Sequence, residues 1–287
     1  MTKNEAMPGK FCPVPLRQLL KLILKELGDN GTIFGIPREL FFIPEQNQAI
    51  RTEIFGHSLH SPVGVAAGPH TQMAQNIVAA WLTGARYIEL KTVQVLDELD
   101  VSKPCIDMQD EGYNCEWSQE LKIRESFAEY LNAWIIIHIL NRRFGWGDDP
   151  GTVFNMSVGY NLEGIMQDKV QWFLDMMNDC SDELHTRIEE IIDIYPEDAE
   201  ADIPSRICDN ITLSTMHGCP PDEIEAIARY LISERKLHTL VKLNPTLLGP
   251  EVLRQILNDK LAFNTVVPDE AFAHDLKYND AVRIIRS

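Results

Sequence analysis

The feature that most constrains the fold is a regular alternation of short apolar runs with longer amphipathic segments, which begins near Ser61. The runs have the length of β-strands, and the segments between them carry apolar residues at helical spacing. Near-continuous apolar strands separated by helices are typical of a parallel sheet buried on both faces. The predicted strands are residues 63–67, 87–91, 153–157, 210–214, 240–244 and 263–267; helical segments lie near 70–83, 118–143, 163–193, 221–235, 250–258 and 271–285.

The first 60 residues have a different pattern. Leucine and isoleucine residues recur at helical spacing between Pro15 and Leu27, and Gly28 and Gly31 are expected to end this helix. Two proline-punctuated runs, residues 33–37 and 41–44, are predicted to be extended. We therefore expect an N-terminal helical and extended appendage over residues 1–60, followed by an α/β domain over residues 61–287.

Six βα units are two fewer than a closed (β/α)8 barrel contains. The sequence also stops within a predicted helix, at residues 281–287. One interpretation is a (β/α)8 TIM barrel truncated after six units, as part of a longer polypeptide that supplies strands seven and eight. The other is a complete, open six-stranded α/β sheet. We expect the truncated barrel.

Composition excludes several classes of protein. The 43 Asp and Glu residues outnumber the 26 Lys and Arg residues, and the net charge of −17 repels the phosphate backbone of nucleic acids. The six cysteines include no C-x-x-C pair, so no iron–sulfur or structural zinc site is predicted here. No signal peptide is recognisable, and the apolar run at residues 133–140 is shorter than the ~20 residues of a membrane span. We expect a cytoplasmic protein with reduced thiols.

Ligands of parallel α/β proteins bind at the carboxyl ends of the strands. The first predicted strand leads into Ala66, Ala67 and Gly68, small residues that allow a flat ligand to approach the backbone; a tight turn that needs Gly68 explains them equally. Lys91 and Lys242 lie in the second and fifth predicted strands. A lysine buried in a sheet needs a partner or a ligand anion. The two lysines therefore indicate an anionic or electron-accepting ligand.

The third and fourth predicted strands also end in polar residues. Asn161 is interpreted either as a ligand contact or as a helix N-cap. Ser214, Thr215, His217 and Cys219 follow the fourth strand. Cys219 precedes a predicted helix, whose dipole is expected to lower the pKa of the thiol, although a structural cysteine and a structural loop histidine remain equally open.

Taken in order, these strand ends resemble the dihydroorotate dehydrogenase superfamily, most closely the FMN barrel of dihydropyrimidine dehydrogenase. The motifs that carry the resemblance are SPVGVAAGP (61–69), YIELKT (87–92), MSVGYN (156–161), LSTMHG (213–218) and VKLNP (241–245). The whole chain is also similar to the N-terminal part of the putative selenate reductase subunit family. IFGIP (33–37), STMHGCPP (214–221) and FAHDL (272–276) carry that closer resemblance.

The resemblance implies roles for residues at the strand ends. Ala66, Ala67 and Gly68 would lie along the isoalloxazine ring of FMN. Lys91 and Thr92 would lie beside the ring and the ribityl chain, and Asn161 would contact flavin or substrate. Lys242 would lie near the N1–C2 edge and stabilise the charge of the reduced ring.

The chain departs from the pyrimidine-reducing relatives on the fourth strand. Thr212 replaces their asparagine, and Thr215 replaces their proton-donating cysteine. Ser214, Thr215 and Cys219 are therefore the candidates for the catalytic acid or base. The FMN phosphate site of the superfamily follows strands seven and eight.

We expect an FMN-dependent oxidoreductase barrel that passes hydride or electrons between flavin and an unidentified small-molecule substrate. The resemblance implies that iron–sulfur and FAD/NAD(P) regions of a multi-centre enzyme lie outside this chain. An alternative is a non-catalytic scaffold barrel that organises redox subunits. A third interpretation is a flavin-free, phosphate-binding lyase that uses Lys91 or Lys242 as a Schiff-base lysine.

Overall fold

A computed structural model of the chain describes residues 11–97, 106–107, 113–114, 119–196, 202–214, 219–273 and 275–287. The central sheet contains β5 (Gly64–Val65), β6 (Tyr87–Glu89), β9 (Val153–Val158), β10 (Asn210–Ser214) and β11 (His238–Lys242). All neighbours are parallel and follow one another in chain order, β5-β6-β9-β10-β11. Sequential order is that of a (β/α) barrel, whereas a doubly wound open sheet reverses direction at a switch point. Five predicted strands and the barrel class are thereby confirmed.

The sixth predicted strand, residues 263–267, is wrong. This segment forms no regular secondary structure, and its apolar side chains are exposed to solvent: Phe263 is 56% exposed and Val266 is 89% exposed. The Asn258 carboxamide donates to the carbonyl oxygens of Phe263 and Thr265, both at 2.8 Å. These carbonyls are therefore bonded to a preceding helical side chain rather than to β11. Apolar, β-branched residues favour a strand only where neighbours pack against them.

The strands alternate in character instead of being apolar on both faces, as the sequence had indicated. Register places Glu89 beside Asn155, Ser157 beside Thr212, and Ser214 beside Lys242. Because successive strand residues point to opposite faces, one face of the sheet is polar and the other apolar. The apolar side, here called the outer face, carries Ile88, Leu90, Phe154, Met156, Val158, Ile211 and Leu213, all within the hydrophobic core.

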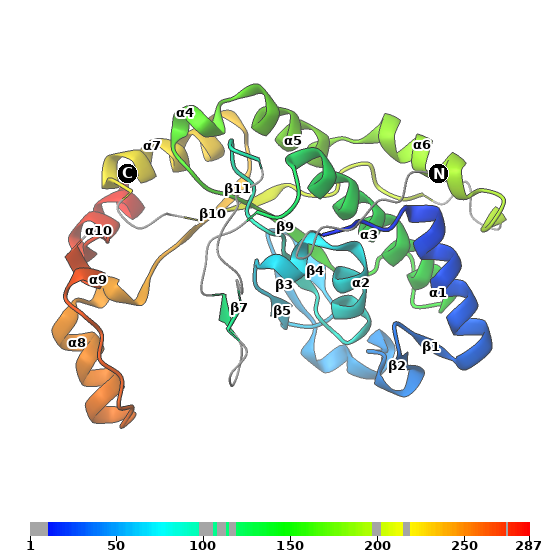
Figure 1. Cartoon of the computed structure of the whole chain (residues 1–287), viewed down its shortest axis with the longest axis horizontal. Helices are drawn as coiled ribbons and strands as arrows, with labels where there is room; N and C mark the ends of the chain where they lie inside the picture. Colours follow the sequence, from blue (N-terminus) through cyan, green and yellow to red (C-terminus); the bar gives the residue numbers. More distant parts are fainter. Residues whose placement is uncertain are drawn as a thin grey trace, which may run out of the picture.

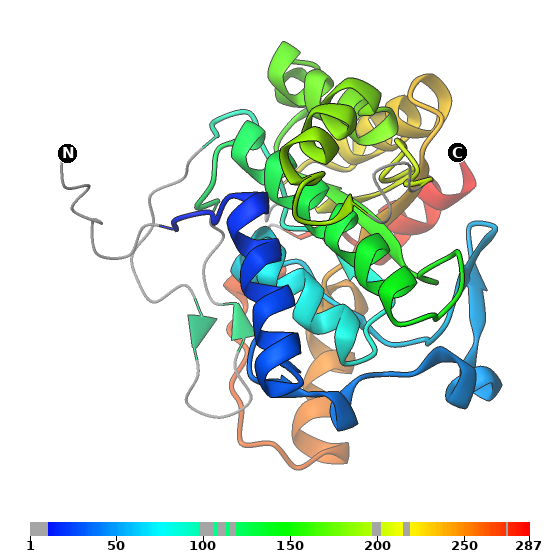
Figure 2. The same cartoon turned by 90° about the vertical axis from the view of Figure 1, so that its right-hand side faces the viewer.

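Helices cover the outer face. α2 (Ala74–Leu82) packs against α3 (Ile123–Arg143), and α3 packs against α5 (Asp168–Asn178) (Figure 1; Figure 2). The Trp134 ring of α3 meets the Phe154 ring of β9 edge to face, with centroids 5.2 Å apart. α3 is thus held directly on the sheet, which leaves the polar face for other uses.

The N-terminal segment is joined to the same core. α1 (Leu16–Asn30) buries Leu16, Leu19, Leu20 and Ile23 in the hydrophobic cluster and packs against α6 (Ser181–Ile191). The helix ends at Gly31, whose left-handed backbone (φ 68°) suits glycine. Two short hairpins follow, β1 (Thr32–Ile33) with β2 (Ile36–Pro37) and β3 (Thr52–Ile54) with β4 (His57–Leu59). The predicted N-terminal helix is confirmed.

The C-terminal segments lie on the opposite side of the molecule from α1 (Figure 1, orange and red). α10 (Tyr278–Arg286) is tied to α7 (Pro221–Arg229) by Arg283, which forms ion pairs with Asp222 and Glu225. The remaining elements are α4 (Leu162–Ile165), α8 (Pro250–Arg254), α9 (Glu270–Ala273), β7 (Ile106–Asp107), β8 (Tyr113–Asn114) and the short helical segments Arg38–Leu40, Pro44–Ile50, Pro69–Gln72, Tyr230–Glu234, Pro245–Leu248 and Gln255–Lys260. Within the described ranges, no helix combines the length and apolarity that crossing a membrane requires.

Candidate active site

The polar side of the sheet, here called the inner face, gathers side chains from four strands and their ends. Its members are Glu89, Lys91, Asn155, Ser157, Asn210, Thr212, Ser214 and Lys242. Polar groups buried at this density require partners. Their hydrogen bonds and ion pairs therefore define the geometry of the candidate site.

Glu89 connects the two edges of the sheet. Its Oε1 and Oε2 lie 3.2 and 3.4 Å from the Lys242 Nζ at the end of β11, and its Oε2 accepts the Ala67 N–H, at 3.0 Å, just after β5. β9 and β10 lie between β6 and β11, so a flat sheet would separate these strands by about 14 Å. Contact across that interval shows that the inner face is concave, as in a barrel.

Lys91 and Thr92 continue from β6 at the carboxyl end of the sheet. Lys91 is 3% exposed, and its carbonyl accepts the Tyr130 hydroxyl of α3 at 3.3 Å. The hydroxyls of Thr92 and Ser157 are 2.8 Å apart. The structure therefore places Lys91 and Thr92, two of the predicted cofactor residues, at the carboxyl end of the sheet.

Thr212 lies lower on the inner face, in a chain of hydrogen bonds. Its hydroxyl donates to Asn155 Oδ1 at 2.6 Å, and the Asn155 carboxamide donates to Asn210 Oδ1 at 2.6 Å. Asn210 in turn donates to the Phe154 carbonyl at 3.2 Å. These bonds satisfy buried polar atoms and fix the three side chains as the floor of the site.

The loop after β5 places Ala66 at the surface, Ala67 half-buried and Gly68 buried. A Cβ on Gly68 would come within 2.6 Å of the His70 ring, so a larger residue here would have to displace that ring. Burial lowers the pKa of His70, which the neighbouring charge of Lys91 lowers further and a hydrogen bond to the Ala66 backbone raises. The loop and Lys91 are therefore close neighbours.

Asn161 acts as the N-cap of α4, which is one of its two predicted roles. Its Oδ1 accepts the Gly164 N–H at 2.8 Å, and Glu223 Oε1 accepts the neighbouring Leu162 N–H at 2.7 Å. Tyr160, just before it, has a left-handed backbone (φ 92°). A strained non-glycine residue at a strand end is typical of functional loops.

The predicted catalytic residues are only partly placed. Ser214 is half-buried at the end of β10, in register with Lys242. Thr215 and His217 lie outside the described residues. The prediction that the helix dipole lowers the pKa of Cys219 is wrong: burial raises this pKa, and the charge of Glu223 raises it further. Both causes disfavour the charged thiolate.

Sequence reasoning missed Glu89, Asn155, Ser157 and Asn210 as site residues. The alternation of polar and apolar residues along the strands could have indicated them. Glu89, for example, lies two residues before Lys91 and therefore shares its face. The strands were interpreted as continuous apolar runs, and that interpretation concealed the alternation.

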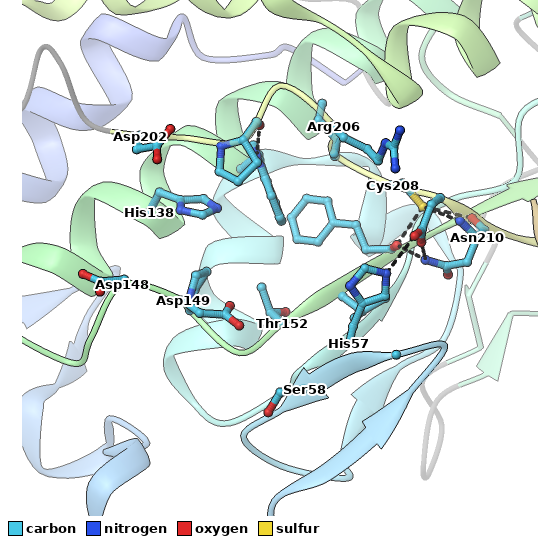
Figure 3. A pocket seen from close by; sticks show the side chains of 18 residues that line it. His57, Ser58, His138, Asp148, Asp149, Thr152, Asp202, Arg206, Cys208 and Asn210 are labelled. Atoms are coloured by element: carbon cyan, nitrogen blue, oxygen red, sulfur yellow. Dashed lines mark hydrogen bonds and ion pairs between the residues drawn. The ribbon is translucent and has the colours of Figure 1, made fainter.

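A cavity of about 680 Å³ lies at the other end of the sheet, at the starts of β9 and β10. Figure 3 shows His57, His138, Asp149, Asp202 and Arg206 around it. His57 and Asp209 pair across its edge, with Nε2 and Oδ2 2.8 Å apart. Burial lowers the pKa of His138 to about 4. None of the predicted cofactor-binding or catalytic residues lines this cavity.

Among the described residues, no group of three or more His, Cys, Asp or Glu side chains is arranged to hold a metal ion. Cys180, Cys208 and Cys219 are thiols that form no disulfide. Burial raises the pKa of both Cys180 and Cys208 to about 12. These two buried thiols are structural groups, since reactivity requires the thiolate.

Comparison with known proteins identifies relatives along nearly the whole chain. Residues 34–287 match the family described as "Oxidoreductase YgfK, N-terminal TIM-barrel domain". Two curated relatives, both named "Putative oxidoreductase YgfK", come from Escherichia coli strain K12 and Escherichia coli O157:H7. Each is 45% identical over 296 residues, covering 95% of this chain and 28% of the relative. The chain thus spans little more than a quarter of their length.

Two solved structures of DHODH from Eimeria tenella are also similar to this chain. The ligand-free form is 16% identical, covers 75% of this chain and 67% of its own, and has a TM-score of 0.36. The complex with ferulenol is 13% identical, covers 81% and 72%, and has a TM-score of 0.40.

Proposed function

The chain belongs to the family of N-terminal TIM-barrel domains of the oxidoreductase YgfK, and from that premise we propose that it is an FMN-dependent oxidoreductase barrel. In this proposal hydride or electrons pass between flavin and a small-molecule substrate. Because the chain covers 28% of its curated relatives, we assign the iron–sulfur and FAD/NAD(P) centres to regions outside it.

The observation that carries the proposal is the polar inner face at the carboxyl ends of the strands. A buried lysine, Lys91, and a half-exposed one, Lys242, extend from strands of the same sheet toward this end. The carboxyl ends of barrel strands are where TIM-barrel enzymes bind their ligands. Two ammonium groups there favour a ligand that is anionic or becomes so on reduction.

The residues present fit a flat, electron-accepting ring. Gly68, where a Cβ would strike His70, belongs to a small-residue loop that also includes exposed Ala66 and half-buried Ala67. In the proposal this loop lies along the ring, with Lys91 and Thr92 beside it and Lys242 near its N1–C2 edge. Bound FMN would supply two-electron chemistry, which protein side chains cannot perform alone.

The remaining residues orient the ring or handle protons. Thr212, held by Asn155, forms the floor below the ring, and Asn161 borders the site from the cap of α4. Ser214 and Thr215 are proposed to exchange a proton with substrate through their hydroxyls. The pKa of Cys219 is raised, so its thiol stays protonated at neutral pH and would act as an acid.

A visible absorption spectrum of a purified full-length family member, measured beside the 287-residue chain, tests this function, because the FMN phosphate site of the superfamily follows strands seven and eight. We expect flavin bands that remain with the protein through gel filtration, and Lys242→Ala is expected to reduce the retained flavin at least tenfold. A Glu39→Gln variant, altered at an exposed distant position, serves as the control.

The spectra of the two proteins separate the two main interpretations, an FMN barrel and a non-catalytic scaffold barrel. Retained flavin that is lost on Lys242→Ala supports the FMN barrel. Absence of flavin assignable to the barrel in both proteins would contradict the proposed function and favour the scaffold.

A further inference from the structure

We propose that Glu89 is a positioning residue of the flavin site, which sets both the place and the effective charge of Lys242. This inference rests on the proposed function and extends it. Glu89 lies within the YIELKT motif (87–92) but is not one of the cofactor residues expected there, Lys91 and Thr92. Its assignment comes from its contacts alone.

Glu89 links two parts of the proposed site that are distant in sequence. One carboxylate contacts Lys242, at the end of edge strand β11, and the backbone of Ala67, after edge strand β5. The lysine and the small-residue loop are two parts of the proposed ring site, and they lie 175 residues apart in sequence. Glu89 therefore fixes the distance between them across the concave face.

The Lys242 ammonium is more accessible to a ligand than the carboxylate that contacts it. The Lys242 side chain is 48% exposed, whereas that of Glu89 is 11% exposed. The ammonium can thus be reached from the open side of the site while the carboxylate stays behind it. A ligand can approach Lys242 without displacing Glu89, and the lysine would then be shared between them.

The negative charge of Glu89 acts on the positive charge of Lys242. A carboxylate 3.2 Å from an ammonium offsets part of its positive charge. The site would therefore stabilise a reduced, negatively charged ring less than an isolated lysine would. Removing the charge of Glu89 should raise the reduction potential of the bound flavin, and removing Lys242 should lower it.

Three variants separate charge from position. Glu89→Gln keeps an oxygen that accepts the Ala67 N–H but removes the charge; Glu89→Ala removes both; Glu39→Gln is the exposed control. We expect Glu89→Gln to bind reduced FMN about tenfold more tightly relative to oxidised FMN, a rise of about 30 mV in midpoint potential. Glu89→Ala is expected to weaken both redox forms at least tenfold, because the loop and the lysine lose their link.

A second measurement needs no flavin. Brief labelling with acetic anhydride, followed by peptide mass spectrometry, compares the acylation rate of Lys242 among the same variants, with Lys169 as internal control. Acylation requires the Lys242 Nζ to be available to the reagent, and in the wild type both carboxylate oxygens of Glu89 hold it, at 3.2 and 3.4 Å. We expect Glu89→Gln to accelerate labelling of Lys242 about threefold and to leave Lys169 unchanged.

The two readouts have distinct outcomes. If neither the chain nor a full-length family member holds FMN in the barrel but labelling of Lys242 still depends on Glu89, the positioning by Glu89 stands and the proposed function fails. If FMN binds, while neither the potential nor the labelling rate responds to Glu89→Gln, the inference is overturned and the proposed function stands.

Discussion

The two faces of the central sheet are built from alternate residues of the same strands, yet they meet different requirements. On the outer face, Phe154 packs against Trp134 of α3, with ring centroids 5.2 Å apart. One residue further along, on the inner face, Asn155 is fully buried within a chain of hydrogen bonds. The comparison shows that this sheet places most of its packing on one face and its candidate chemistry on the other.

The difference has a thermodynamic consequence. Burial of apolar surface on the outer face stabilises the fold by roughly 25 cal/mol per Å². Polar groups buried on the inner face only compensate their own desolvation when every partner is in place. Substitutions on the two faces should therefore differ in size and in what they affect.

The largest effect is expected on the outer face. Phe154→Ala should lower the free energy of unfolding by about 3–5 kcal/mol, because it removes a ring that is 1% exposed and leaves a cavity under α3. Urea unfolding followed by circular dichroism measures the loss. Phe154→Leu, which retains more of the volume, is the matched variant and should lose less. Equal stability of Phe154→Ala and wild type would break the assignment of packing to this face.

The next effect depends on pH and tests the helical layer. His138 of α3 is 4% exposed, and burial lowers its pKa from 6.5 to about 4. Between these values the unfolded state binds more protons, so stability falls as pH falls from 6.5 to 4, by about 3 kcal/mol for this group. His138→Phe, which keeps an aromatic ring beside Trp134, should flatten the pH dependence of unfolding by that amount.

The control for His138→Phe is His185→Gln on α6, where the histidine side chain is 77% exposed. Both variants are compared with wild type by urea unfolding at several pH values from 4 to 7. If His138→Phe leaves the pH dependence of the free energy of unfolding unchanged, burial does not lower the pKa of His138.

The smallest of these effects is expected on the inner face. Thr212→Val removes the hydroxyl that donates to Asn155 Oδ1 at 2.6 Å, and should destabilise the chain by about 1–3 kcal/mol. Thr212→Ser retains the donor and is expected to stay near wild type. The same urea titration checks both variants. Unchanged stability in Thr212→Val would contradict a stabilising role of this hydrogen bond, and an equal loss in Thr212→Ser would mean that the methyl group matters as much as the bond.

Alternation of apolar runs with helices was enough to predict a parallel α/β sheet, because periodicity is a local property, and the family resemblance favoured a barrel over an open sheet. Five strands and the long helix of residues 123–143 follow from the alternation. Residues 263–267 satisfy the same composition but form no strand, since a strand also needs a neighbour and cover. The pattern could not supply either.

The candidate site was less predictable, because its geometry depends on contacts between distant residues. Lys91 and Lys242 were recognised as buried or strand-end lysines, but the carboxylate between them was not. Glu89 and Lys242 are 153 residues apart, and only folding shows that they meet. The predicted sign of the Cys219 pKa shift was wrong for a similar reason, because the burial that raises this pKa exists only in the folded chain.

The most direct test of a flavin site at the strand carboxyl ends is hydrogen–deuterium exchange of a full-length family member with and without FMN, followed in the region that matches this chain. The inner face at the strand carboxyl ends should bind the ligand, so exchange should slow in residues 64–68, 87–92 and 240–244. The segments that line the cavity at the opposite end, residues 56–58 and 202–210, should exchange as before. Slowed exchange at that cavity, with none at the strand carboxyl ends, would contradict the account.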